Sequence, residues 1–134
     1  MDQSNHPHLT LIHDFFVAYG NNDQTAIEEI LALDIKWHIP GRHALSGTKK
    51  GVKEVHNFFK DLEKGAFKAE PIATGVNGDY VVDCHRNWSE LDTDDKFEAM
   101  SCLLWKVKDG RIVEVSNFPQ DQQVVDAFFK KVYG

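Results

Sequence analysis

His38 is the residue in this sequence best suited to acid–base chemistry, and it stands in a short alternating run just before Pro40. A neutral imidazole can accept a proton near pH 7, because the unperturbed pKa of imidazole is about 6.5. A carboxylate such as Asp83 would fix the tautomer of His38 and stabilise the cation that forms. The alternative is that His38 is a structural residue that bonds a backbone group near Pro40. We predict His38 and Asp83 as the catalytic pair, with His38 as the base.

Four amphipathic helices are predicted from the spacing of apolar residues. They comprise residues 9–19, a segment that Asp23 caps and Asp34 ends, residues 51–64 and residues 122–132. Residues 35–39 alternate between apolar and polar, which predicts a short strand, and a loop at residues 42–48 follows it. His43 on this loop is expected to be solvated, whereas His56 on the third helix suits either the interior or the solvent.

The second half of the chain changes from helical to alternating periodicity. Strands are predicted at residues 71–76, 79–91, 96–108 and 111–118, with turns at Asn77-Gly78, residues 92–95 and Asp109-Gly110. Asn-Gly and Asp-Gly between alternating runs are strong hairpin signals. Helices followed by a meander of long strands predict an α+β domain. Strands of about a dozen residues must bend, and helices over the concave face of the sheet would leave a pocket.

Three stretches resemble the SnoaL-like branch, also called ketosteroid-isomerase-like, of the NTF2-like superfamily. These are Trp37-His38-Ile39-Pro40-Gly41-Arg42, Leu45-Ser46-Gly47-Thr48 and the run from Trp105 to Val115. The resemblance covers residues 9–129. It implies a cone in which a curved antiparallel sheet is wrapped by about four helices around a central pocket. It also implies a homodimer through the outer face of the sheet.

The resemblance to ketosteroid isomerases can be followed residue by residue. His38 falls where those enzymes carry their catalytic Asp base, and Phe15 falls where they carry an oxyanion-binding Tyr. Leu103 falls near the position of their protonated Asp. The usual oxyanion donors are therefore missing, which argues against steroid isomerisation by the known mechanism and favours a different reaction with a different base.

Strand alternation then assigns the residues of the pocket. If Leu103 faces inward, so do Ser101 and Trp105, because alternate side chains share a face. A one-residue error of register would reverse these assignments. The expected polar groups are His38, Asp83, His85, Asn87, Ser101 and Asn117. The expected apolar and aromatic walls are Phe15, Tyr19, Val55, Phe59, Leu103 and Trp105.

Such a pocket predicts a small-molecule ligand, because apolar cavities with a few convergent polar groups are typical ligand sites. Tyr19 or Asn117 would donate a hydrogen bond to a developing oxyanion. For His85 with Asp83 two interpretations stay open, namely a buried structural pair and a catalytic pair.

Several classes of partner are not expected. The net charge is −6 and the basic residues are dispersed, so neither nucleic acid nor an anionic membrane surface is predicted as a partner. No phosphate-binding loop, nucleophile elbow or metal-ligand spacing occurs, so no cofactor and no metal is expected. Cys84 and Cys102 are interpreted as free thiols. The polar residues 1–8 are expected to form a flexible tail before a single domain at residues 9–134, in the cytoplasm.

Three functions are consistent with these features. The leading hypothesis is an isomerase, cyclase or dehydratase that acts by general acid–base catalysis on an apolar, oxygenated molecule. The second is a binding protein with the same pocket and no chemistry. The third is a protein-interaction module, which would require a large exposed apolar patch.

Overall fold

The structure, a computed structural model, describes residues 6–92 and 96–134. The described residues form four helices and six strands. The helices are α1 (Pro7–Gly20), α2 (Gln24–Ile30), α3 (Gly51–Glu63) and α4 (Gln122–Tyr133). The strands are β1 (Leu31–Ile39), β2 (Gly47–Lys50), β3 (Phe67–Asn77), β4 (Tyr80–Ser89), β5 (Glu98–Lys108) and β6 (Arg111–Pro119). The predicted α+β architecture, with its helices and its strand meander, is confirmed.

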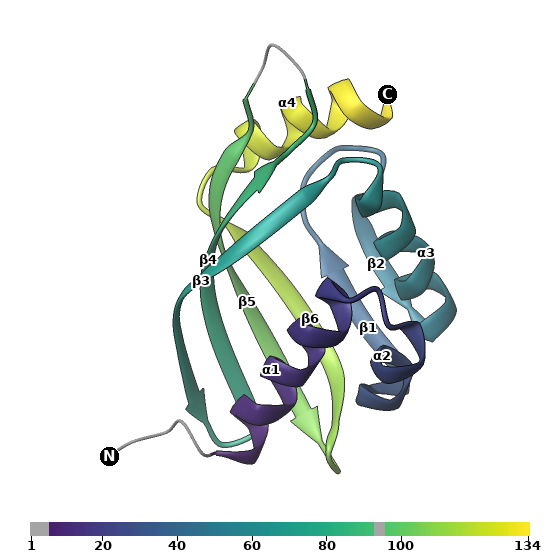
Figure 1. Ribbon diagram of the computed structural model, residues 1–134, viewed down its shortest axis with the longest axis vertical. Coiled ribbons are helices and arrows are strands. Elements are labelled where there is room, and N and C mark those ends of the chain that lie inside the picture. The colour runs from purple at the N-terminus through teal and green to yellow at the C-terminus, as the bar shows by residue number, and fades with distance from the viewer. Residues whose placement is uncertain (1–5, 93–95) are drawn as a thin grey trace.

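The six strands form one curved sheet in the order β2-β1-β6-β5-β4-β3. β1 pairs with β6 in parallel, and every other neighbouring pair is antiparallel. α1, α2 and α3 lie against one face of the sheet, and α4 lies at the end of the sheet farther from α1 (Figure 1). The long strands bend across the molecule, so the helices enclose the concave face.

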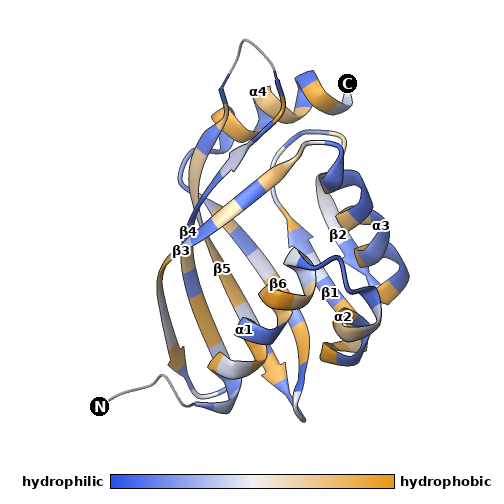
Figure 2. Ribbon diagram, viewed as in Figure 1, coloured by the Kyte–Doolittle hydropathy of each residue, from blue (hydrophilic) through white to orange (hydrophobic). Residues whose placement is uncertain are grey.

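Alternation decides which residues form the core. Val81, Leu103 and Trp105 are buried on the inner face, whereas Tyr80, Val82 and Met100 are exposed on the other face. Hydrophobic and hydrophilic residues are interspersed along β4 and β5 (Figure 2). The tight turn between β5 and β6 uses Asp109 and Gly110, both with positive φ (53° and 75°), as a two-residue hairpin turn of this kind requires.

The edges of several elements differ from prediction. α1 begins at Pro7, within the predicted tail, because proline fits the first turn of a helix and His6 Nδ1 accepts a bond from the amide of His8 (3.1 Å). β1 begins at Leu31, which the sequence placed on the second helix. Leu31 has extended backbone angles and is 1% exposed. Asp34 therefore lies inside β1, exposed, and does not end a helix.

One strand, β2, was not predicted, and another, β3, was predicted only in part. β2 (Gly47–Lys50) lies where a loop was expected and pairs with β1, placing Thr48 opposite His38. β3 begins at Phe67, before Pro71, and a register shift between Pro71 and Ala73 accommodates the proline. Proline is tolerated there because β3 is an edge strand, where a missing amide donor leaves no neighbour unpaired. The turn predicted at residues 92–95 falls mostly outside the described residues.

Candidate functional site

A cavity of about 1070 Å³ lies between the concave face of the sheet and the helices. All four helices and the strands β1, β3, β4, β5 and β6 contribute residues to its wall. The wall is mostly apolar and aromatic. Some of its polar groups come from the middle of the sheet, where the inward positions of β4, β5 and β6 carry Asp83, His85, Asn87, Ser101 and Asn117. This cavity lies where the sequence predicts a central pocket, and its occupation by a small molecule stays a prediction.

The register of the central strands agrees with the predicted inward faces. Asp83 lies opposite Leu103, and His85 lies opposite Ser101. Asn117 of β6 lies opposite Leu103 on its other side. The predicted residues that line the cavity are Phe15, Tyr19, Phe59, Asp83, His85, Asn87, Ser101, Leu103 and Asn117.

Asp83 is the most deeply buried charged residue of the site, with 1% of its surface exposed. One carboxylate oxygen accepts a hydrogen bond from the indole Nε1 of Trp105 at 2.5 Å. The other lies 2.8 Å from Nδ1 of His85. An ionised carboxylate can only accept hydrogen bonds, so Nδ1 of His85 carries the proton that it donates to Asp83. In neutral His85 the free lone pair is then on Nε2.

Nε2 of His85 is open to the cavity. The side chain of His85 is 11% exposed and lines the cavity wall. No hydrogen-bond partner of this atom occurs among the described residues, and none of their buried side-chain nitrogen or oxygen atoms lacks a partner. Nε2 must therefore be accessible to molecules in the cavity. The arrangement is a base whose orientation is fixed by a buried carboxylate.

Other polar groups surround this base. Asn87 donates a hydrogen bond to the hydroxyl of Ser101 at 3.3 Å. Burial, and next the carboxylate of Glu63, raise the pKa of Tyr19 to about 12. The phenol of Tyr19 therefore stays protonated at neutral pH and can donate a hydrogen bond to an oxygen in the cavity.

His38 lies on the opposite face of the sheet, so its predicted place in the pocket beside Asp83 is wrong. Ile35 and Trp37 are buried on the inner face of β1, and alternation turns His38 outward. There the hydroxyl of Thr48 donates to Nδ1 of His38 (2.8 Å), while Nε2 donates to the carboxylate of Glu114 (2.6 Å). The carboxylate that fixes the tautomer of His38 is therefore Glu114.

Two further predicted pocket residues lie behind the wall. Val55 and Trp105 are fully buried and do not line the cavity. Val55 is part of the core beneath α3, and Trp105 supports Asp83 through its indole hydrogen bond. Both were placed correctly on inward faces. Periodicity identifies the face of a residue, but it does not distinguish the surface of a cavity from the layer behind it.

Three further histidines line the cavity although none of them is among the predicted pocket residues. They are His13 of α1, His43 on the loop before β2 and His56 of α3. His43 is half-buried against Phe129, with the ring centroids 4.4 Å apart, and burial lowers its pKa. The amide of Leu45 donates to its Nδ1, so the proton of neutral His43 lies on Nε2. No periodic pattern marks a loop residue, and a short loop gives no signal of the direction in which it folds.

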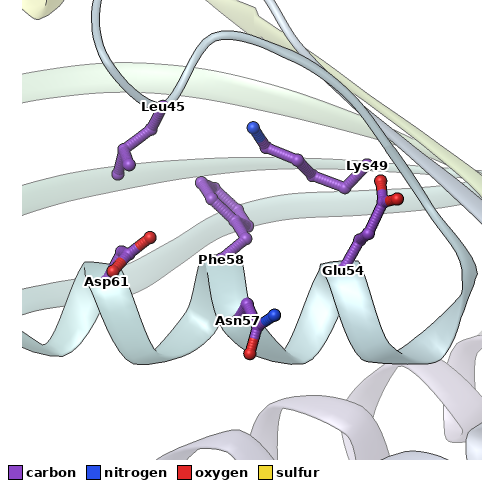
Figure 3. A pocket seen from close by; sticks show the side chains of 6 residues that line it. All are labelled: Leu45, Lys49, Glu54, Asn57, Phe58 and Asp61. Atoms are coloured by element: carbon purple, nitrogen blue, oxygen red, sulfur yellow. The ribbon is translucent and has the colours of Figure 1, made fainter.

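A smaller pocket of about 210 Å³ lies outside the main cavity, between α3 and the loop that precedes β2. Figure 3 shows Lys49, Glu54 and Asp61 around it, with Phe58 at its base. The amino group of Lys49 lies 5.9 Å from the centre of the Phe58 ring. Its charged groups are of both signs and face the solvent, so this pocket offers no buried base.

No group of three or more His, Cys, Asp or Glu side chains in residues 6–92 and 96–134 is arranged to hold a metal ion. Within the same ranges, no helix has both the length and the apolar character needed to cross a membrane.

Comparisons with known proteins agree with this fold. The family model of the SnoaL-like domain matches residues 12–115. The uncharacterised protein Rv0034 of Mycobacterium tuberculosis is 24% identical over 126 residues, which are 90% of this chain and 95% of that protein.

Two solved structures share the fold. Bal32a, from a soil-derived mobile gene cassette, superposes with a TM-score of 0.85 at 22% identity, covering 92% of this chain and 96% of its own. TerC, co-crystallised with polyporic acid, superposes with a TM-score of 0.80 at 17% identity, covering 93% of this chain and 98% of its own. With the sequence match extending from α1 into β6 and the same fold in these structures, the chain belongs to the SnoaL-like domain family.

Proposed function

We propose that this protein is a general acid–base catalyst for an apolar, oxygenated small molecule, with His85 as the base. The observation that carries the proposal is the hydrogen bond between buried Asp83 and Nδ1 of His85, which leaves Nε2 directed to the cavity. The proposed reaction type is the one expected from the sequence, but the proposed base is His85 and not His38.

The reaction would begin with removal of a proton from a carbon next to a carbonyl. Nε2 of His85 takes the proton, and the electron pair of the broken C–H bond moves to the carbonyl oxygen. Asp83 stabilises the imidazolium that results, because its carboxylate already holds the Nδ1 proton. Tyr19 or Asn117 donates a hydrogen bond to the enolate oxygen. Isomerisation, aldol-type cyclisation and dehydration all start with this step.

The second candidate is a binding protein that performs no chemistry. It is favoured by the completeness of the Trp105–Asp83–His85 chain, which links β4 to β5 and is itself a stabilising network. TerC supports a ligand in either case, because that protein of the same fold was crystallised with polyporic acid.

Proton exchange separates the two candidates. We expect the wild-type protein to accelerate exchange of the acidic protons of 2-tetralone in D₂O, followed by NMR. His85→Gln should lose about 100-fold or more of this acceleration, in the range that a positioned base contributes. His38→Gln is the matched control and should keep the wild-type rate within about threefold. Binding of 2-tetralone without accelerated exchange would instead identify a binding protein.

A further inference from the structure

The aromatic side chains around the cavity form two separate groups. The first, called here the α1 cluster, is centred on Phe15 and consists of Phe15, Phe16, Tyr19, Trp37, Phe58, Phe59 and Trp105. The second, called the α4 cluster, consists of His43, Phe67, Phe97, Phe128, Phe129 and Tyr133. Within the described parts of the chain, no ring contact joins the two clusters.

The two clusters lie at opposite ends of the cavity. Trp105 of the α1 cluster is near the end of β5, whereas Phe97 of the α4 cluster directly precedes that strand. Ser101 lies midway between them, about 13 Å along the strand from each at the usual rise of about 3.3 Å per residue. α1 and α4 accordingly lie at different ends of the sheet (Figure 1).

The wall between the clusters is polar. Asp83, His85 and Asn87 occupy three successive inward positions of β4. On β5, Ser101 lies opposite His85, and on β6, Asn117 lies in the same row as Asp83 and Leu103. We call these five side chains the polar belt. The cavity therefore has an aromatic cluster at each end and the polar belt between them.

The size of the cavity fits a ligand that reaches both ends. Its volume of about 1070 Å³ lies at the upper limit of the usual range for small-molecule sites, roughly 300 to 1,000 Å³. A molecule with a single ring would fill one cluster and leave the other to water. Burial of apolar surface contributes about 25 cal/mol per Å² to the free energy of binding, so a ligand that fills both ends binds more tightly.

We propose that the ligand of this cavity is an elongated molecule with an apolar ring at each end and oxygen-bearing groups between them. This inference deepens the proposed function and rests on it for the identity of the site. The rings pack on the α1 and α4 clusters, and the oxygens accept or donate hydrogen bonds at the polar belt. A molecule with an apolar middle would leave the belt desolvated without partners, which costs affinity.

Three probes that differ in the number of rings or in the carbonyl group test the substrate class. Chalcone has two rings joined through a carbonyl-bearing link, acetophenone has one ring and the carbonyl, and trans-stilbene has two rings and no oxygen. Binding can be followed by quenching of the fluorescence of Trp37 and Trp105 and by calorimetry. Chalcone should bind at least tenfold more tightly than either of the others. Equal affinity for chalcone and acetophenone, or tighter binding of stilbene, would overturn the inference.

A pair of substitutions tests the two ends separately. Phe16 and Phe67 are both half-buried and line the cavity, one in each cluster. Phe16→Ala and Phe67→Ala should each weaken chalcone at least fivefold, while only one of them weakens acetophenone. Val124→Ala, at an exposed position of α4, is the control and should change neither affinity. Equal losses for both ligands in both variants would mean an undivided site. If an alanine variant does not fold, Phe→Leu at the same position should give the same pattern with smaller factors.

The outcomes also separate this inference from the proposed function. Chalcone has no acidic proton on a saturated carbon next to its carbonyl, so it reports binding without the proposed chemistry. Binding at both ends without exchange of 2-tetralone protons would refute catalysis and leave the two-ended ligand intact. Exchange that depends on His85, with no preference for chalcone, would refute the two-ended ligand and leave catalysis intact.

Discussion

Asp83 shows how one buried carboxylate can serve both stability and chemistry. Its two oxygens accept from Trp105 and from His85, so its charge is stabilised although it is 1% exposed. The same two bonds fix the orientation and the tautomer of His85. Asp83 therefore defines the candidate site as much as His85 does, because it positions the base.

Asp83→Asn should impair both roles. An amide nitrogen cannot accept a hydrogen bond, so either Trp105 or His85 loses its acceptor. We expect a loss of about 1 to 3 kcal/mol in the free energy of unfolding, measured by urea denaturation. We also expect loss of proton exchange comparable to that of His85→Gln, because the tautomer of His85 is no longer fixed. Full exchange activity in Asp83→Asn would contradict the role assigned to this pair.

Tyr19 gives a prediction of pH dependence. Its pKa is raised to about 12 in the folded protein, by burial first and then by Glu63, whereas an unfolded tyrosine ionises near pH 10. The stabilisation is therefore complete below about pH 10 and is lost as the pH rises to about 12. Between these values wild type should lose up to about 1.4 kcal/mol per pH unit more than Tyr19→Phe, measured by urea denaturation. If the free energy of unfolding changed with pH in the same way in both proteins, this prediction would be wrong.

Strand β1 shows why the site was predicted only in part. Both Trp37 and His38 suit an inner face, the first by hydrophobicity and the second by chemistry, and a short strand gives few positions to decide between them. The structure places Trp37 inside and His38 outside. On β4 and β5 the resemblance placed Leu103 in the pocket, and alternation from Leu103 then assigned Asp83, His85 and Ser101 to the correct face.

The remaining differences also have local causes. β2 has four residues and pairs with β1 alone, so its structure depends on a tertiary contact that no local pattern reveals. His43 reaches the cavity because the side chain of Ser46 bonds the amide of His43 and the carbonyl of Pro40. Helices and hairpins, in contrast, follow from local periodicity and turn residues, and these were predicted.

The outward position of His38 leads to a prediction at the level of β1 and β6. The pair of His38 and Glu114 is at the surface, with side chains 35% and 43% exposed. Exposed ion pairs contribute about 0 to 1 kcal/mol. His38→Gln and Glu114→Gln should therefore each change the free energy of unfolding by less than about 1 kcal/mol in urea. A loss of several kcal/mol in either variant would show that the pair is buried in solution.

At the scale of the whole molecule, we predict a homodimer through the outer face of the sheet. Tyr80 and Val82 of β4, Met100 of β5 and Phe118 of β6 are exposed there, and clustered apolar side chains favour association. Light scattering coupled to size-exclusion chromatography should give twice the chain mass at micromolar concentration. Val82→Lys should shift the equilibrium to monomer, whereas Leu33→Lys, at another exposed position, should not. A monomeric wild-type protein would refute this interface.

The parallel pairing of β1 with β6 has a consequence for how the protein is made. His38 pairs with Ser116, so one edge of β1 finds its partner only in the last strand of the sheet. During synthesis, the edge of β1 that pairs with β6 lacks its hydrogen-bond partners until β6 has left the ribosome. Such long-range contacts slow folding, because the ends of a long loop must meet before either gains a partner. Chains that end before β6 should therefore be especially prone to aggregate and to engage chaperones.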